Sequence, residues 1–325
     1  MRRKISKRIC LFILTIITFG IIVLPYGPGQ ANALQERVGS STINSPSPAV
    51  SDKKGSSPAE TSSYLMLNVR TGEKLLAEND EVQRQPASTV KLLTGLVAME
   101  KLHENDLIRV GEEVRNTDGS QLGLQPGDQI LVKDLLTALY VESANDAAIV
   151  LAVSAYGTMD DFLNAMNQYA SKIGSTNSKF KTPNGLPYHD QFTTAHDLAQ
   201  IALEFIKKEE LMKYVNMKEA TVEWTRSSGF KQKKLVKNTN QLLGIYPGDI
   251  GLKTGTTTEA GQCLVTYITR PDGDILLVLL GSKQRYKDTI ELLDQGMAKI
   301  RTRSALKSIT SHPDSLVTAP GFFAP

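Results

Sequence analysis

The pattern of apolar and polar positions changes from strand-like to helical and back to strand-like along the chain. Two apolar runs, 64–69 and 74–77, flank a turn that contains Gly72, and this arrangement predicts a first β-hairpin. Two longer apolar runs, 262–269 and 275–280, are joined by a Pro-Asp-Gly-Asp turn. They predict a second hairpin with long, buried strands.

Helical spacing dominates the chain between these hairpins. Val90, Leu93 and Val97 recur at intervals of three and four and predict a helix that runs from about Ser88 to His103. Similar apolar stripes predict further helices around 135–140, 148–153, 194–205 and 286–301. We therefore expect an α+β fold, in which the N- and C-terminal hairpins pair into one antiparallel sheet flanked by helices. A mostly helical lobe is inserted between the hairpins.

The first 33 residues have the pattern of an export signal. Five basic residues precede an uncharged, mostly apolar run from Ile9 to Leu24, which is short for a membrane-spanning helix. Ala31-Asn32-Ala33 offers a small-x-small cleavage site. Two alternatives stay open: the segment is cleaved and the protein is secreted, or the segment is retained as an N-terminal membrane anchor. In either case the folded part is expected outside the cytoplasm.

Composition divides the rest of the chain into three parts. Residues 34–62 are rich in Ser and Pro and predict a flexible stalk. Residues 63–304 hold the predicted strands and helices and form the expected folded domain. Residues 305–325 show no sustained period, so we expect a disordered tail there.

Charge and cysteine content exclude several classes of function. The formal net charge is +3, but without the leader 32 basic residues face 34 acidic ones, a net of −2. We therefore expect no nucleic-acid binding, and we interpret Lys231, Lys233, Lys234 and Lys237 as a solvated face. The only cysteine outside the leader is Cys263, so the mature chain has no internal disulfide. The four histidines lack metal-ligand spacing, and we expect no metal and no cofactor.

The stretch Pro86–Gly95 places a hydroxyl and an amine three residues apart at the start of a predicted helix. Residues i and i+3 share one helical face, so the side chains of Ser88 and Lys91 can touch. An adjacent amine can accept the proton of a hydroxyl nucleophile, which makes Ser88 a candidate nucleophile and Lys91 a candidate base. Taken alone, the pattern also fits an ordinary capped helix start.

Two further stretches carry compatible chemistry. Ser143 and Asn145 fall at a break between two apolar helices, where their side chains would project from a loop. Lys253–Thr256 lies at the edge of a predicted strand, where glycine lets another backbone approach and the lysine and hydroxyls can bind an anion. The patterns Ser-x-x-Lys, Ser-x-Asn and Lys-Thr-Gly thus occur in this order, with their first residues 55 and 110 positions apart.

With these three motifs the chain resembles a low-molecular-mass penicillin-binding protein of the serine-type D-alanyl-D-alanine carboxypeptidase family. The resemblance extends over roughly Ser63 to Lys299 and implies a β-lactamase/transpeptidase-like fold. Further stretches similar to that family are 143–148, 184–186, 192–195, 238–243 and 251–256. One departure is Ala144, where the family usually has glycine. Many members have a C-terminal β-domain and an amphipathic anchor, for which we expect no counterpart here.

The resemblance also implies the roles of the site residues. Ser88 is the nucleophile, Lys91 the general base, and Ser143 the group that passes a proton to the departing amine. Substrate binding is assigned to Asn145, Lys253, Thr254 and Thr256, and the oxyanion hole to the backbone N–H groups of Ser88 and Thr256. Lys253 is expected to hold Ser143 in place, and Asn145 to orient Lys91.

The implied activity is removal of the terminal D-alanine from peptidoglycan stem pentapeptides through an acyl-enzyme on Ser88. The implied location is the extracytoplasmic face of a bacterial cell envelope, and β-lactams are the implied covalent inhibitors. Three alternatives stay open: a D,D-endopeptidase that cuts peptidoglycan cross-links, a class A-like β-lactamase, and a non-catalytic penicillin-binding sensor. The deacylation glutamate of the class A lactamases has no clear counterpart here, which disfavours that alternative.

Overall fold

The computed structural model describes residues 62–311 of the 325-residue chain, with side chains to residue 307. The predicted leader at 1–33, nearly all of the predicted stalk and the last part of the predicted tail lie outside these residues. No helix among the described residues has the length and apolar character needed to cross a membrane.

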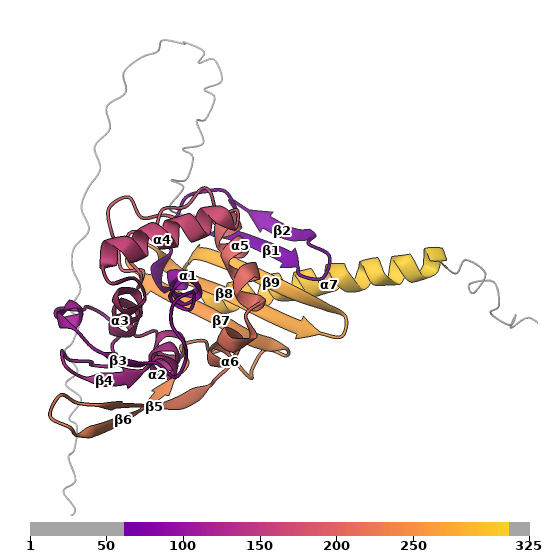
Figure 1. Ribbon diagram of the computed structural model, residues 1–325. Coiled ribbons are helices and arrows are strands. Elements are labelled where there is room, and N and C mark those ends of the chain that lie inside the picture. The colour runs from indigo at the N-terminus through magenta and orange to yellow at the C-terminus, as the bar shows by residue number, and fades with distance from the viewer. Residues whose placement is uncertain (1–61, 312–325) are drawn as a thin grey trace, which may run out of the picture. The chain divides into compact units, whose positions relative to one another are not determined.

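A five-stranded antiparallel sheet joins the two ends of the described chain, in the order β2-β1-β9-β8-β7 (Figure 1). Its strands are β1 (Ser63–Asn68), β2 (Lys74–Glu78), β7 (Asp249–Thr257), β8 (Gly261–Arg270) and β9 (Gly273–Ser282). The first hairpin meets the second through β1 and β9, where Leu65 lies opposite Val278. The predicted pairing of the terminal hairpins into one sheet is confirmed.

Both faces of this sheet are buried, and β9 shows why its sequence is almost continuously apolar. Its alternate residues Leu276, Val278 and Leu280 face the helical lobe, and Ile275, Leu277 and Leu279 face the last helix. Side chains of a strand alternate between its two faces, so a strand covered on both sides must be apolar at every position.

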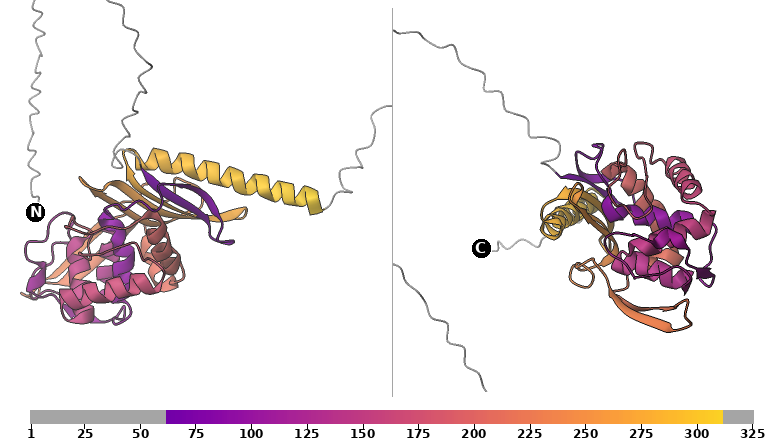
Figure 2. Two further views of the ribbon diagram at one scale, coloured as in Figure 1. Left: turned by 90° about the horizontal axis from the view of Figure 1, so that it is seen from above. Right: turned by 90° about the vertical axis from the view of Figure 1, so that its left-hand side faces the viewer.

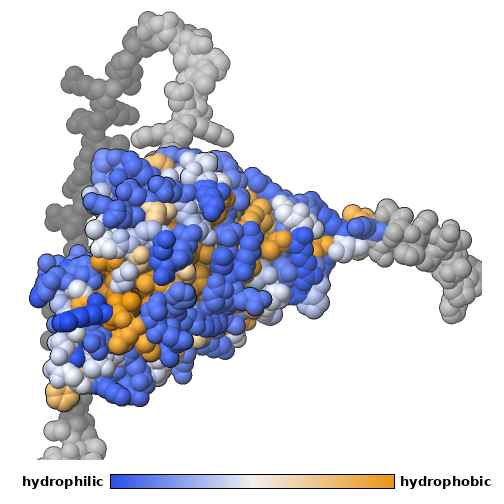
Figure 3. All heavy atoms as spheres, viewed as in Figure 1, coloured by the Kyte–Doolittle hydropathy of each residue, from blue (hydrophilic) through white to orange (hydrophobic). Residues whose placement is uncertain are grey.

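Helices cover both faces of the sheet (Figures 1 and 2). Helix α7 (Arg285–Ser311) packs on one face against β9, β8 and β2. The lobe on the other face contains α1 (Lys91–Ala98), α2 (Val132–Thr137), α3 (Asn145–Tyr156), α4 (Met159–Lys172), α5 (Ala195–Ile206) and α6 (Glu209–Val215), with the short turns η1 (Ala87–Val90), η2 (Glu112–Val114) and η3 (Ala138–Glu142). Figure 3 shows that hydrophilic residues cover most of the surface in view, with hydrophobic residues exposed in patches between them.

The lobe also contains a second antiparallel sheet, which the sequence pattern did not predict as a unit. Its strands run in the order β3 (Leu107–Arg109), β4 (Gln129–Leu131), β5 (Glu219–Thr225) and β6 (Lys231–Lys237). The first two strands have three residues each, too few to show a period. The sheet packs against α2 and η3 through β5 and β6.

Two predicted helix boundaries are wrong. The helix expected to reach His103 ends at Ala98. The last helix, expected to end at Arg301, continues to Ser311, so residues 305–311 are helical and not a disordered tail. Side chains 301–307 are exposed, and an exposed helix needs no apolar stripe that a sequence pattern could reveal.

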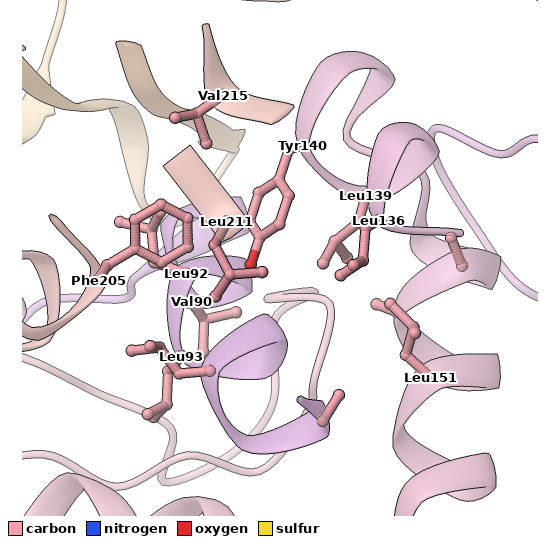
Figure 4. Packing of buried hydrophobic residues seen from close by; sticks show 14 of the residues in the cluster. Val90, Leu92, Leu93, Leu136, Leu139, Tyr140, Leu151, Phe205, Leu211 and Val215 are labelled. Carbon is pink, nitrogen blue, oxygen red and sulfur yellow. The ribbon is translucent and has the colours of Figure 1, made fainter. Parts of the chain in front are cut away.

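Tyr140 joins η3 to α1 at the centre of the lobe, and Figure 4 shows its hydroxyl directed toward the α1 helix. A Cβ added at Gly95 of α1 would lie 1.6 Å from this hydroxyl. Tyr140 is fully buried, with 0% exposure, so its ring has no free space into which to retreat. The absence of a side chain at Gly95 therefore sets how closely α1 and η3 approach.

We predict that Gly95→Ala lowers the free energy of unfolding by about 1–3 kcal/mol, because overpacking outweighs the gain in helix propensity of roughly 1 kcal/mol. Urea unfolding measures this change. Gly111→Ala is the matched control, since a Cβ there would meet only the side chain of Glu113. Equal stability of the Gly95→Ala variant and the wild type would contradict the packing argument.

Candidate active site

Ser88 and Lys91 meet at the junction between η1 and α1. The Lys91 amine donates a hydrogen bond of 2.7 Å to the Ser88 hydroxyl. Ala87, one residue earlier, has a positive φ of 47°, in the region that disfavours any residue other than glycine. The predicted contact between nucleophile and base candidates is therefore present, and it stands next to a strained backbone position.

Lys91 is fully buried, and the hydrogen-bond partners of its amine among the described residues are all oxygen atoms. Its amine donates to Asn145 Oδ1 and to the backbone oxygen of Asn184, both at 2.7 Å. Burial, and secondarily the Lys253 ammonium, hold the pKa of Lys91 well below its usual range, whereas Asp146 acts in the opposite direction. An amine with a lowered pKa can be neutral at physiological pH and accept a proton.

The middle motif lies where η3 ends and α3 begins. Ser143 has a left-handed φ of 63° and is 7% exposed, and Asn145 is the first residue of α3. The Asn145 amide donates from Nδ2 to the backbone oxygen of Asp118 at 2.7 Å, which fixes its Oδ1 toward Lys91. The hydrogen bonds found among residues 62–307 include none between Ser143 and Lys253, the contact expected from the sequence.

The third motif lies on β7, alongside η1. A Cβ added at Gly255 would lie 2.8 Å from the backbone nitrogen of Ser88, so only glycine permits this approach. Lys253 is 1% exposed and donates to the backbone oxygen of Thr254 at 3.0 Å. Burial, and secondarily the Arg285 guanidinium, lower the pKa of Lys253 to about 7. The three motifs thus converge at one place.

Comparison with known proteins decides the family. The family model described as D-alanyl-D-alanine carboxypeptidase matches residues 50–284, which is most of the chain. The chain belongs to the D-alanyl-D-alanine carboxypeptidase family. This result confirms the resemblance inferred from the three motifs.

Curated relatives of the chain are also named D-alanyl-D-alanine carboxypeptidases. The chain is 30% identical to D-alanyl-D-alanine carboxypeptidase DacF of Bacillus subtilis, over 81% of its own length and 73% of the relative. It is also 30% identical to DacC of Escherichia coli, over 75% of its own length and 63% of that protein. The chain therefore spans about two thirds of several longer relatives.

Solved structures agree with the fold. The crystal structure of the Streptomyces K15 DD-transpeptidase matches with a TM-score of 0.69 and 28% identity, over 72% of this chain and 96% of that chain. The carboxypeptidase DacD of Francisella tularensis matches with a TM-score of 0.65 and 29% identity, over 74% and 69%. The predicted fold class is confirmed.

Sequence reasoning missed Arg285 as part of the carboxypeptidase site. Its guanidinium donates to the Gly255 backbone oxygen at 2.8 Å, to the Cys263 backbone oxygen at 2.9 Å and to the Thr256 hydroxyl at 2.5 Å. Arg285 is the first residue of α7, so the pattern marked it only as a helix start. Only the folded sheet places the start of α7 next to β7, where Arg285 contacts Gly255 and Thr256.

Sequence reasoning also gave no role to Asn184, although its stretch is similar to the family. The loop is anchored by Thr94, whose hydroxyl donates to the Pro183 backbone oxygen at 2.5 Å. Gly185 has φ of 81°, and a Cβ there would lie 1.9 Å from the backbone oxygen of Ala87. A backbone carbonyl carries no residue signature, so only the structure could show that Asn184 contacts Lys91.

The residues set aside from the sequence remain outside the site, with one correction. Lys231, Lys233 and Lys237 are exposed, but the solvated-face interpretation is wrong for Lys234, which is half-buried and forms a 2.7 Å ion pair with Glu142. Cys263 is buried, and burial raises the pKa of its thiol to about 11. Among the described residues, no group of three potential metal ligands occurs.

The lowered pKa of Lys253 predicts a rise in stability with pH. Between about pH 7 and the ordinary lysine value of 10.5, the unfolded chain holds a proton at Lys253 that the folded chain has lost. The free energy of unfolding should therefore increase with pH across this window, by on the order of a few kcal/mol. In Lys253→Met the free energy of unfolding should rise less steeply with pH. The rise that remains is the contribution of Lys91, whose pKa is also lowered.

Urea unfolding at several pH values tests this, with Lys172→Met as a control for an exposed lysine. The same slope in the wild type and in Lys253→Met would show that Lys253 keeps its ordinary pKa.

Proposed function

We propose that this enzyme removes the terminal D-alanine of peptidoglycan stem pentapeptides through an acyl-enzyme on Ser88. The observation that carries the proposal is the 2.7 Å contact between the Ser88 hydroxyl and the fully buried Lys91 amine. The family assignment supplies the reaction class and the extracytoplasmic peptidoglycan substrate.

The contacts of Lys91 account for every proton of a neutral amine. A neutral amine has two N–H donors and one lone pair. Asn145 Oδ1 and the Asn184 carbonyl carry no hydrogen, so each takes one N–H. The lone pair is left for the third neighbour, the Ser88 hydroxyl. In this state the base already points at the proton it must remove.

The reaction then follows in two halves. Ser88 Oγ attacks the carbonyl carbon of the penultimate D-alanine while its proton passes to Lys91, and the N–H groups of Ser88 and Thr256 stabilise the oxyanion. The peptide bond breaks as the departing D-alanine nitrogen takes a proton from Ser143, and Ser143 regains the proton that Lys91 took from Ser88. Water next attacks the ester and releases the shortened peptide and free Ser88.

The free carboxylate of the substrate would lie near Lys253 and Arg285. The Arg285 guanidinium is held at Thr256, an exposed residue of β7, whereas Lys253 on the same strand is buried. Two cations and the hydroxyls of Thr254 and Thr256 match a carboxylate. Burial, and secondarily the Arg285 guanidinium, lower the pKa of Lys253, and a bound carboxylate would raise it again.

The N-terminal segment completes the proposal. The basic cluster and apolar run of residues 1–33 would direct export, followed by cleavage or by retention as a membrane anchor. The assembled peptidoglycan lies outside the cytoplasm, which agrees with export.

We predict that Ser88→Ala abolishes covalent labelling by a fluorescent penicillin and all release of D-alanine from a pentapeptide. The attacking oxygen is gone, so no acyl-enzyme can form. Ser171→Ala, on the exposed surface of α4, should behave like the wild type. Labelling of the Ser88→Ala variant at any serine would contradict the assignment.

Mass spectrometry of products separates the peptidase activities. The wild type should convert pentapeptide to tetrapeptide plus D-alanine faster than it cuts a cross-linked dimer. Preferential cleavage of the dimer would identify an endopeptidase instead.

We predict that Arg285→Gln raises KM for a peptide with a free terminal carboxylate by roughly 10- to 100-fold, the usual effect of losing a hydrogen bond to a charged group. A peptide with an amidated terminus should be affected far less. Arg301→Gln is the matched control, because Arg301 lies on the same helix and pairs with Asp272. An equal loss on both peptides would contradict carboxylate binding by Arg285.

A further inference from the structure

The loop 118–124 lies directly against the middle motif of the site. Two of its backbone carbonyls accept hydrogen bonds of 2.7 Å from Asn145: Ser120 from the backbone N–H and Asp118 from Nδ2. A Cβ added at Gly119 would lie 2.8 Å from Asn145 Nδ2 and 3.9 Å from Leu186 Cδ2. The loop therefore covers Asn145 on the side of the Asn184 loop.

Asp146 holds this loop in place. Its carboxylate accepts hydrogen bonds from three successive backbone N–H groups, at 3.0 Å from Leu122, 2.8 Å from Gly123 and 3.0 Å from Leu124. Asp146 is 1% exposed, so these donors replace its water. Successive N–H groups that converge on one anion form a strong site, here occupied by a side chain of the same protein.

The loop in turn decides how the Asn145 amide is oriented. A carboxamide can present either its oxygen or its NH₂ to a neighbour. With Nδ2 bound to the Asp118 carbonyl, the oxygen faces Lys91. Without that carbonyl the amide could turn, and its NH₂ would then face the Lys91 amine as a second donor. The base would lose an acceptor and its alignment with Ser88.

We propose that Asp146 is a positioning residue, which fixes loop 118–124 so that the Asp118 carbonyl orients Asn145 and, through it, Lys91. This inference rests on the proposed function, because it assumes that Lys91 is the base for Ser88. Neither Asp146 nor the loop touches the reacting atoms in this scheme. The position of the loop affects the chemistry through the Asn145 amide, and the charge of Asp146 also acts on Lys91 directly.

A second attachment holds the opposite side of the loop. Lys234 on β6 donates to the Gln121 backbone oxygen at 2.9 Å and pairs with Glu142, directly before Ser143, at 2.7 Å. The side chain of Lys234 is 36% exposed, so a variant there leaves the buried contacts of Asp146 untouched. Lys234 therefore offers a way to loosen the loop while the Asp146 carboxylate stays in place.

The charged groups that face Lys91 define the expected pH effect. Lys253 on β7 lowers the pKa of Lys91, and Asp146 on α3 raises it. Asp146→Asn removes the carboxylate, so the pKa of Lys91 should fall further. Acylation needs the neutral amine, and the acid limb of its pH profile should therefore move to lower pH.

The test measures acylation by a fluorescent penicillin as a rate constant per labelled site, together with hydrogen exchange of the segment 118–124. In Asp146→Asn we expect exchange to be faster and the plateau rate constant to fall, each by about tenfold or more. The acid limb should move to lower pH. Asp197→Asn is the matched control: Asp197 is also 1% exposed and accepts hydrogen bonds from Asn177 and Ser178. It should lower stability without changing the rate constant per site.

Lys234→Met is the second variant, for the case in which Asp146→Asn does not fold. It should speed exchange in the loop and slow acylation several-fold. An unchanged acylation rate constant and pH profile in Asp146→Asn would overturn the inference. It would also be overturned if the segment 118–124 exchanged faster in Lys234→Met while acylation stayed at the wild-type rate. Absence of labelling in the wild type would instead contradict the proposed function, so the two failures are distinguishable.

Discussion

The site depends on a buried lysine amine that has no carboxylate in contact with it among residues 62–307. Removing a charged ammonium from water is unfavourable, and the protein replaces that water with three oxygens, from Ser88, Asn145 and Asn184. Each oxygen comes from a different segment of the lobe. The fold must therefore hold three separate backbones within hydrogen-bond distance of one atom, and much of the packing around α1 serves this requirement.

Glycine and close packing make that convergence possible. Gly255 lets β7 lie against Ser88, Gly185 lets the Asn184 loop lie against Ala87, and Gly95 admits the Tyr140 hydroxyl. These contacts are between main chains or with a rigid ring, so a side chain in place of any of these glycines would push the two segments apart. The hydrogen bonds of Lys91, at 2.7 Å, would then be stretched or broken. β7 is an edge strand of the large sheet and is held by its pairing with β8, which β9 pairs on the other side.

The sequence predicted the parts of the molecule that need particular residue types at particular spacings. The apolar hairpins revealed the sheet, since β9 has to be apolar on both faces. Ser88, Lys91, Asn145 and Lys253 could be named because the chemistry needs those side chains at those spacings, and the structure brings them together. Thr254 and Thr256 lie on the same strand, where Thr254 contacts the Thr239 hydroxyl at 2.6 Å. The roles of these residues remain proposals.

What the sequence did not predict acts through the backbone or through tertiary placement. The Asn184 and Asp118 carbonyls could belong to any residue type. Arg285 reaches the site only because β9 returns the chain to β7, and Lys234 pairs with Glu142 across two elements that are distant in sequence. The short strand β3 pairs with β4, and β4 pairs with β5. Each has only three residues, too few to show a pattern of its own.

The most direct test of this account is the protonation state of Lys91 itself. Its side-chain nitrogen can be followed by NMR in ¹⁵N-labelled protein across the pH range of acylation, with the resonance assigned by its loss in Lys91→Arg. The account predicts a pKa well below the ordinary 10.5 and a neutral amine at the pH where Ser88 is acylated. A Lys91 ammonium that stays charged throughout that range would contradict it.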